Sequence, residues 1–311
     1  LSDFDTVLPR DTVGIQSYAQ VLSRIVREED LLHFNGSGVA ALVEHGARIA
    51  ASRGKLSTQF GRLADIAREA SFLAQKQGRK AVTADGVRDF TVLVFDDVDL
   101  ENVLEQTVAA KYRNSGQVCV SPTRFLVQES VYDKFVDGFT KRAAALKVGN
   151  GLDESVEMGP LAHPRRLDAM ESLLGDAAEH QATFNTGGKR MPGPGYFWEP
   201  TVLSGVPLNA RIMNEEPFGP VALINPFTSY DDAVSEANRL EYGLAAFAFS
   251  NDAKRVTRLG DDLEAGMIGV NTFRISVPES PFGGIKESGH GSEEGIEGLE
   301  TCLITKFVSE A

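Results

Sequence analysis

The spacing of apolar residues changes about 90 residues into the chain. Before that point apolar side chains recur every three to four residues, which is the period of an amphipathic helix. This period predicts a helix over residues 12–29, a second after Ser37, a third from Ser57 or Thr58, and a short fourth from Thr83. We therefore expect residues 1–90 to form a small all-α helical bundle without a strand.

From residue 91 onward, short apolar runs alternate with longer amphipathic segments. The apolar runs predict strands at residues 91–95, 124–127, 221–225, 245–249 and 267–270. The segments between them predict helices at residues 99–112, 131–146, 163–180, 230–240 and 253–264. Strands that alternate with helices are typical of a parallel sheet covered by helices. The predicted class is α/β, a mostly parallel sheet with flanking helices, preceded by the helical bundle.

Composition supports the same division. Residues 1–90 carry 12 Lys or Arg against 11 Asp or Glu, whereas residues 91–311 carry 19 against 33. Only Pro9 lies in the first part, and the other 12 prolines follow it, as suits a helical segment before a loop-rich one. The overall charge of −13 argues against nucleic acid or an anionic membrane surface as a partner. We expect a domain boundary near residue 90.

Several classes of protein are not expected. No apolar run approaches the ~20 residues that span a bilayer, and the first residues lack the basic start and apolar core of a signal peptide. Two cysteines, Cys119 and Cys302, make a disulfide framework unexpected and favour a reducing, cytoplasmic location. The five histidines show no metal-ligand spacing, so no metal site is predicted.

Three phrases carry the candidate chemistry. Cys119 ends the phrase Asn-Ser-Gly-Gln-Val-Cys, Glu216 and Phe218 lie in Glu-Glu-Pro-Phe-Gly-Pro, and residues 281–289 read Pro-Phe-Gly-Gly-Ile-Lys-Glu-Ser-Gly. A lone cysteine is usually a small buried apolar side chain. In this order and at these separations, however, the phrases resemble the catalytic half of an aldehyde dehydrogenase. The resemblance covers residues 91–311.

The resemblance implies roles for individual residues. Cys119 would be the nucleophile, whose thiolate attacks an aldehyde carbonyl while its backbone N–H helps to stabilise the oxyanion. Asn114 offers an amide to the same loop. Glu216 would bind the ribose hydroxyl groups of NAD or NADP, because a carboxylate accepts two hydroxyl donors, and Phe218 would pack beside the nicotinamide.

The implied substrate is a small aldehyde. Arg274 and Ser276 match the family's pocket-lining segment and are suited to a carboxylate at the far end of a semialdehyde. Within the family, the sequence looks most like bacterial succinate-semialdehyde dehydrogenases. Residues 299–311 are similar to the family's terminal oligomerisation segment, which implies a homo-oligomer.

Two parts of the family pattern are not found. The family's general-base glutamate falls at Asp85, a shorter carboxylate in an unrelated phrase, and nothing in residues 1–90 replaces the family's dinucleotide-binding domain. Residues 1–88 resemble the helical lid of the ATPase module in Lon-type proteases, in which Arg62 or Arg68 would reach a nucleotide. A phosphate-binding G-x-x-x-x-G-K-[ST] loop is absent from the sequence. The alternatives to an active dehydrogenase are therefore a catalytically incomplete chimera and a lid-type interaction module.

Overall fold

A computed structural model of the chain describes residues 7–34, 38–39, 42–43, 55–57, 67–68, 71, 90–289, 291–300, 303 and 306–310. By its internal contacts the chain divides into two compact units, Leu1–Gly86 and Val87–Ala311. Each unit has its own hydrophobic core, so the two are described separately.

The first unit is built on helix α1 (Thr12–Glu28), which confirms the helix predicted at residues 12–29. The carboxylate of Asp11 accepts a hydrogen bond from the backbone N–H of Gly14 and so caps the first turn. The buried face of α1 repeats every four residues, at Gly14, Tyr18, Leu22 and Val26. The described residues at 38–39, 42–43, 67–68 and 71 are also helical, and the helix predicted from Thr83 lies outside the described residues.

The prediction that the first unit contains no strand is wrong. Strand β1 (Val7–Pro9) pairs antiparallel with β2 (Lys55–Ser57), and the side chain of Leu56 is completely buried in the same cluster as Tyr18. Each strand has only three residues, too few to show the two-residue alternation of a strand in the sequence. Ser57, a predicted helix cap, therefore lies in a strand.

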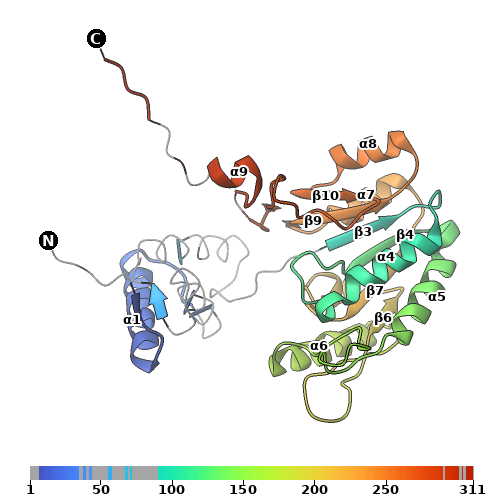
Figure 1. Cartoon of the computed structure of the whole chain (residues 1–311), viewed down its shortest axis with the longest axis horizontal. Coiled ribbons are helices and arrows are strands. Elements are labelled where there is room, and N and C mark those ends of the chain that lie inside the picture. Colours follow the sequence, from blue (N-terminus) through green and yellow to red (C-terminus); the bar gives the residue numbers. More distant parts are fainter. Residues whose placement is uncertain are drawn as a thin grey trace. The chain divides into compact units, whose positions relative to one another are not determined.

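The second unit has a seven-stranded sheet at its centre (Figure 1). In spatial order its strands are β10 (Met267–Val270), β9 (Ala245–Phe249), β3 (Phe90–Val94), β4 (Arg124–Gln128), β7 (Val221–Phe227), β6 (Thr201–Ser204) and β5 (Thr183–Thr186). All neighbours are parallel except β5 and β6. The predicted mostly parallel sheet is confirmed, as are its five predicted strands.

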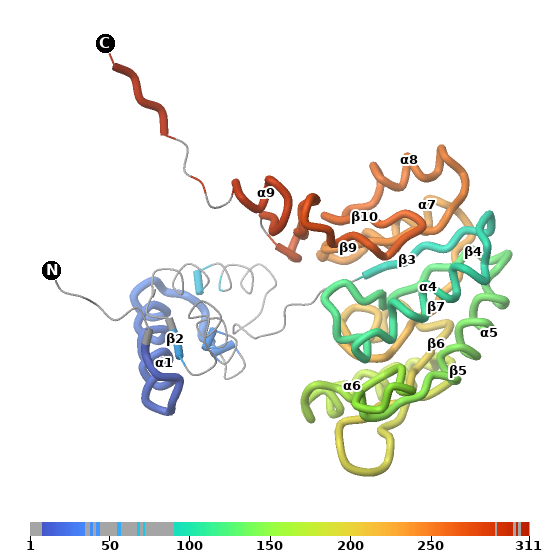
Figure 2. The backbone as a smooth tube through the Cα atoms, viewed as in Figure 1, coloured from blue at the N-terminus to red at the C-terminus, as the bar shows by residue number. Residues whose placement is uncertain are grey.

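Helices cover both faces of this sheet. Helices α4 (Leu100–Tyr112) and α5 (Glu129–Ala145) pack on one face; α6 (Pro164–Glu179), α7 (Tyr230–Ala237) and α8 (Ala253–Asp262) pack on the other. Along β3, Val92 and Val94 join the cluster under α4 and α5, whereas Leu93 joins the cluster under α7 and α8. Figure 2 shows α8 beside the β10 end of the sheet and α6 near β5 and β6.

The strands that the pattern did not predict are short or exposed. β5 is an edge strand with the half-exposed sequence Thr-Phe-Asn-Thr, and β6 has four residues between Pro200 and Gly205. β8 (Tyr242–Gly243) and β11 (Ile285–Lys286) have two residues each and pair with one another. β8 and β11 are too short to show a hydrophobic period, and β5 and β6 carry only one and two apolar residues.

The remaining elements are the 3₁₀ turns η1 (Arg113–Gly116) and η2 (Arg211–Met213) and the helix α9 (Gly295–Glu300). After α9 the described residues Leu303, Phe307 and Val308 are exposed. The predicted oligomerisation role of residues 299–311 stays a prediction. Within the described part of the chain, no helix combines the length and apolar character needed to cross a membrane.

Candidate active site

The first two phrases lie at the amino ends of two neighbouring strands. Cys119 precedes β4, and the loop of Glu216 and Phe218 precedes β7. β4 and β7 are parallel and adjacent, with Arg124 opposite Leu223, so their amino ends lie at the same edge of the sheet. The fold therefore brings together two loops that are about a hundred residues apart in sequence.

The loop of Cys119 is a tight left-handed turn. Asn114, Ser115 and Gly116 have φ values of 52°, 56° and 70°, a region that favours glycine. The side-chain amide of Asn114 donates to the carbonyl oxygen of Gln117 at 2.9 Å, and the backbone N–H of Gln117 donates to the carbonyl oxygen of Asn114 at 3.0 Å. The Asn114 amide thus holds the shape of the loop that leads to Cys119.

Cys119 is half-buried at an apolar edge of the core. It packs against the main core cluster, as do Phe273 and Phe282 from the third phrase and the segment before it. Among the described residues, no carbonyl or side-chain oxygen accepts a hydrogen bond from the backbone N–H of Cys119. That N–H is therefore able to donate to an oxyanion formed next to the sulfur.

The loop of Glu216 lies directly against the loop of Cys119. A Cβ atom on Gly116 would overlap the carbonyl oxygen of Gly219, so these two backbones touch. Phe218 has a φ of 38°, and the backbone N–H of Thr201 donates to the carbonyl oxygen of Pro220 at 2.9 Å. The bond from Thr201 thus anchors the Glu216 loop to the start of β6.

Lys111 is a buried charge that the sequence patterns did not reveal. It lies on the buried face of α4, in its last turn, and its side chain is almost completely buried. Burial lowers the pKa of its ammonium group to about 7, and the carboxylate of Glu216 opposes this shift by attraction. The hydroxyl of Ser121 donates to the Lys111 carbonyl oxygen at 3.2 Å, which ties α4 to the far side of the cysteine loop.

The only signal of Lys111 in the sequence is its position. It falls three residues after Val108, on the apolar stripe of a predicted helix. A lysine at such a position is usually explained by its flexible stem reaching water. Here the surrounding core prevents that, and only the tertiary structure shows it.

The third phrase also lies at the edge of the sheet where the amino ends of the parallel strands meet. β11 pairs with β8, just before β9, and the hydroxyl oxygen of Ser288 accepts a hydrogen bond from the backbone N–H of Gly243 at 2.9 Å. A Cβ atom on Gly266, just before β10, would overlap the carbonyl oxygen of Gly283. The backbone at Gly283 therefore packs closely against the backbone at Gly266.

Arg274 and Ser276, the predicted substrate contacts, are both exposed. The guanidinium of Arg274 forms no ion pair with any residue of the described segments. The hydroxyl of Ser276 donates to both carboxylate oxygens of Glu294, each at 3.4 Å. Ser276 therefore faces a negative charge from a segment of the chain that the sequence did not connect with it.

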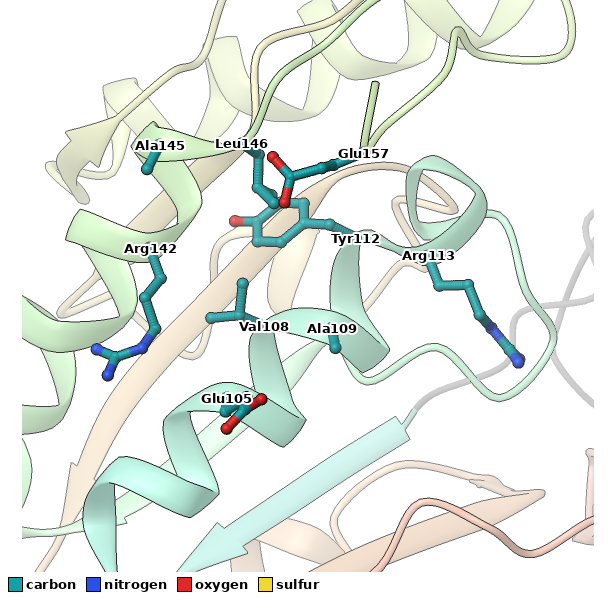
Figure 3. A pocket seen from close by; sticks show the side chains of 9 residues that line it. All are labelled: Glu105, Val108, Ala109, Tyr112, Arg113, Arg142, Ala145, Leu146 and Glu157. Carbon is teal, nitrogen blue, oxygen red and sulfur yellow. The ribbon is translucent and has the colours of Figure 1, made fainter. Parts of the chain in front are cut away.

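A separate cavity of about 510 Å³ lies between the end of α4 and the end of α5 (Figure 3). Its apolar floor and charged rim are formed by Glu105, Val108, Ala109, Tyr112, Arg113, Arg142, Ala145, Leu146 and Glu157. Neither Cys119 nor any other predicted site residue lines it. A cavity that lacks a nucleophile is not the candidate active site.

Other predicted site residues fall in the first unit. The guanidinium of Arg68 pairs with the carboxylate of Glu29 through two contacts, at 2.6 and 2.7 Å. This ion pair engages Arg68 within its own unit. Arg62 and Asp85 lie outside the described residues.

The fold and these two loops define an α/β protein with a cysteine site at the amino edge of a parallel sheet, and comparison with known proteins gives its family. Residues 57–308 match the model of the aldehyde dehydrogenase family. The chain is 45% identical over 217 residues to a 4-(hydroxymethyl)benzenesulfonate dehydrogenase of Comamonas testosteroni, covering 70% of this chain and 45% of that protein. It is 43% identical over 219 residues to a succinate-semialdehyde dehydrogenase of Paenarthrobacter nicotinovorans, covering 70% and 49%.

Solved structures agree with these relatives. The betaine aldehyde dehydrogenase of Staphylococcus aureus in complex with NAD⁺ matches with a TM-score of 0.68 and 38% identity, over 71% of this chain and 44% of that one. This chain belongs to the aldehyde dehydrogenase family. It spans about half the length of the relatives that it matches.

The match also bears on the first unit. It begins at Ser57, well before residue 91 and within the segment that resembles the lid of Lon-type proteases. These comparisons give that lid resemblance no support. The nucleotide-reaching role of Arg62 or Arg68 stays a prediction.

Proposed function

We propose that this chain carries the nucleophile of an aldehyde dehydrogenase, and that Cys119 forms the covalent intermediate through which an aldehyde is oxidised to the corresponding acid, with a nicotinamide dinucleotide as the oxidant. The observation that carries this proposal is the contact between the Cys119 loop and the Glu216 loop at one edge of the sheet. The family membership supports it, because both loops belong to matched residues.

In the proposed reaction the Cys119 thiolate forms a bond from its sulfur to the aldehyde carbon, giving a thiohemiacetal. The backbone N–H of Cys119 donates to the oxygen that becomes negative. Loss of hydride from that carbon leaves a thioester on Cys119. Water then attacks the thioester, which releases the carboxylic acid and restores the thiol.

The residues present fit the nicotinamide end of NAD or NADP. Glu216 is a half-buried carboxylate able to accept the ribose hydroxyl groups, and Phe218 is a half-buried aromatic side chain two residues further on. The ammonium form of Lys111 is attracted by the Glu216 carboxylate. A bound nicotinamide dinucleotide would supply the hydride acceptor.

For the substrate we propose an aldehyde that carries an anionic group, with succinate semialdehyde as the first candidate. The two relatives named above have sulfonate- and carboxylate-bearing substrates in their names. Arg274 provides an exposed guanidinium, and Ser276 a hydroxyl, in the segment before the third phrase. A planar guanidinium binds carboxylate and sulfonate oxygens well.

NADH or NADPH formation by the purified chain with succinate semialdehyde tests the proposal. We expect formation that is lost in Cys119→Ala, and a lower KM for succinate semialdehyde than for butanal, an uncharged aldehyde of the same carbon number. Absence of any Cys119-dependent product from a folded chain would overturn the proposal and favour the catalytically incomplete alternative.

A further inference from the structure

A short segment before and within the first turn of α6, residues 159–166, contacts both loops of the candidate site. The hydroxyl of Ser115, in the cysteine loop, donates to the carbonyl oxygen of Gly159 at 2.7 Å. The backbone N–H of Ala162 donates to the side-chain oxygen of Gln117 at 3.0 Å. At the other end, the guanidinium of Arg166 donates to the carbonyl oxygen of Pro217.

The segment is itself held in a fixed conformation. His163 caps α6, its ring Nδ1 accepting a hydrogen bond from the backbone N–H of Arg165 at 3.1 Å, and Pro164 begins the helix with a restricted φ. Further along α6, the sulfur of Met170 packs against Gly219, so closely that a Cβ added to Gly219 would come within 2.6 Å of it. α6 therefore provides a rigid support for the loop of residues 215–220.

The hydrogen bond from Arg166 falls at a strained point of that loop. Pro217 directly precedes Phe218, whose φ of 38° is unfavourable for a residue with a side chain. A charged donor forms a stronger hydrogen bond to a carbonyl oxygen than a neutral donor does. Arg166 thus stabilises the conformation that presents Glu216 and Phe218, and the contact of Gly219 with Gly116 passes this constraint to the cysteine loop.

We infer that Arg166 is a positioning residue: from α6 it fixes the loop of Glu216 and Phe218 and, through Gly219 and Gly116, the orientation of Cys119. The inference rests on the proposed role of Cys119 as nucleophile. Arg166 donates to a backbone carbonyl oxygen of this loop, so its role is to position the loop.

The variants for the test are Arg166→Met, Arg166→Lys and Arg165→Met, all made together with Cys302→Ser so that iodoacetamide reports on Cys119 alone. Arg165 is the matched control, because it is the adjacent, exposed arginine, and its side chain donates a hydrogen bond to the His163 ring of its own segment. The alkylation rate of Cys119 is measured as a pH profile, and hydrogen exchange is measured for residues 214–220.

For Arg166→Met we expect amide exchange in residues 214–220 to rise by about tenfold, as for the loss of one hydrogen bond to a charged donor. We also expect a changed pH profile of Cys119 alkylation. Arg166→Lys, which keeps a cationic donor, should restore most of both readouts, and Arg165→Met should change neither.

Equal alkylation profiles for Arg166→Met and Arg165→Met would overturn the inference, even if Arg166→Met lowered the melting temperature, because a purely structural role predicts lower stability without altered thiol chemistry. Alkylation requires no turnover. If the chain forms no NADH and the Arg166 effect is present, the proposed function fails while the positioning role is supported.

Discussion

The backbone of Gly116 rests against the carbonyl group of Gly219, and this contact joins the cysteine loop to the loop that carries Glu216. Gly116 has a φ of 70°, and a Cβ there would also come within 2.6 Å of the Gly219 carbonyl carbon. Both the conformation and the space require glycine at this position. The glycine of the phrase is thus needed for the approach of a second loop as well as for its own turn.

We expect Gly116→Ala to separate the two loops. The added methyl group meets backbone atoms that cannot move aside without shifting β7, so we expect a destabilisation of about 1–3 kcal/mol from strain and overpacking. The measurement is urea unfolding combined with the alkylation rate of Cys119.

Gly175→Ala is the control for this substitution. Gly175 lies in α6, and a Cβ added there would meet no atom within 4 Å, so alanine should stabilise the helix by roughly 0.5–1 kcal/mol. Wild-type stability and thiol reactivity in Gly116→Ala would show that the loops do not depend on this contact.

The buried Lys111 should make stability depend on pH. In the unfolded chain the lysine keeps its proton up to its ordinary pKa of 10.5, whereas in the folded chain burial lowers the pKa to about 7. Between these values the unfolded state binds more protons, so the free energy of unfolding contributed by Lys111 rises with pH. Below the folded pKa both states are protonated and the cost of burying the charge is fully present.

We expect Lys111→Met to remove this dependence. Replacing a buried charge by an apolar side chain of similar length should stabilise the chain by about 1–3 kcal/mol near pH 6 and by less near pH 9. Urea unfolding at the two pH values checks this, with Lys134→Met, on the exposed side of α5, as the control. Equal effects of Lys111→Met at both pH values would contradict the low folded pKa.

Glu294 should weaken the binding of anions beside Ser276. Its carboxylate accepts hydrogen bonds from the Ser276 hydroxyl. An anion bound at Ser276 would lie beside this negative charge, and two like charges ~4 Å apart repel by about 1 kcal/mol even in water. We therefore expect Glu294→Gln to strengthen protection of Cys119 by succinate about fivefold. Protection is measured as the succinate concentration that halves the rate of alkylation.

Glu293→Gln removes the same charge one residue away, and its side chain forms no hydrogen bond with Ser276. It should have a smaller effect on protection by succinate. If both variants strengthen protection equally, the effect comes from net charge, and Glu294 has no particular place in the substrate site.

Tyr112 should be an anchor between α4 and the sheet. Its hydroxyl is buried and donates to the carbonyl oxygen of Thr201 at 2.9 Å. Tyr112→Phe leaves that oxygen with one partner fewer, and we expect a loss of about 1–2 kcal/mol in the free energy of unfolding. Tyr196→Phe, at a site that is 38% exposed, should change stability by less than about 0.5 kcal/mol. Equal losses of unfolding free energy in the two variants would contradict the role of Tyr112 as an anchor.

Local pattern was sufficient for much of the second unit. The strands at residues 245–249 and 267–270 were predicted with their observed bounds, because their runs of apolar residues are bounded by turns and flanked by amphipathic helices. Cys119 and Glu216 were predicted as site residues from their phrases, and their roles stay predictions. The strands β5 and β6 were not predicted, because Thr-Phe-Asn-Thr has one apolar residue and Thr-Val-Leu-Ser has two, fewer than the runs that were read as strands. The β1–β2 pair in the first unit was missed because each of its strands has only three residues.

The sequence by itself determined the class of the second unit, its family resemblance and the choice of Cys119 as the candidate nucleophile, since these depend on residue type and local spacing. Only the tertiary structure decided that Gly116 touches Gly219, that Lys111 is cut off from water, and that Arg166 reaches the Pro217 carbonyl. Each of these depends on residues from different elements that the fold brings together. Such contacts are set by strand order and helix packing, which the spacing of residues along a single element does not encode.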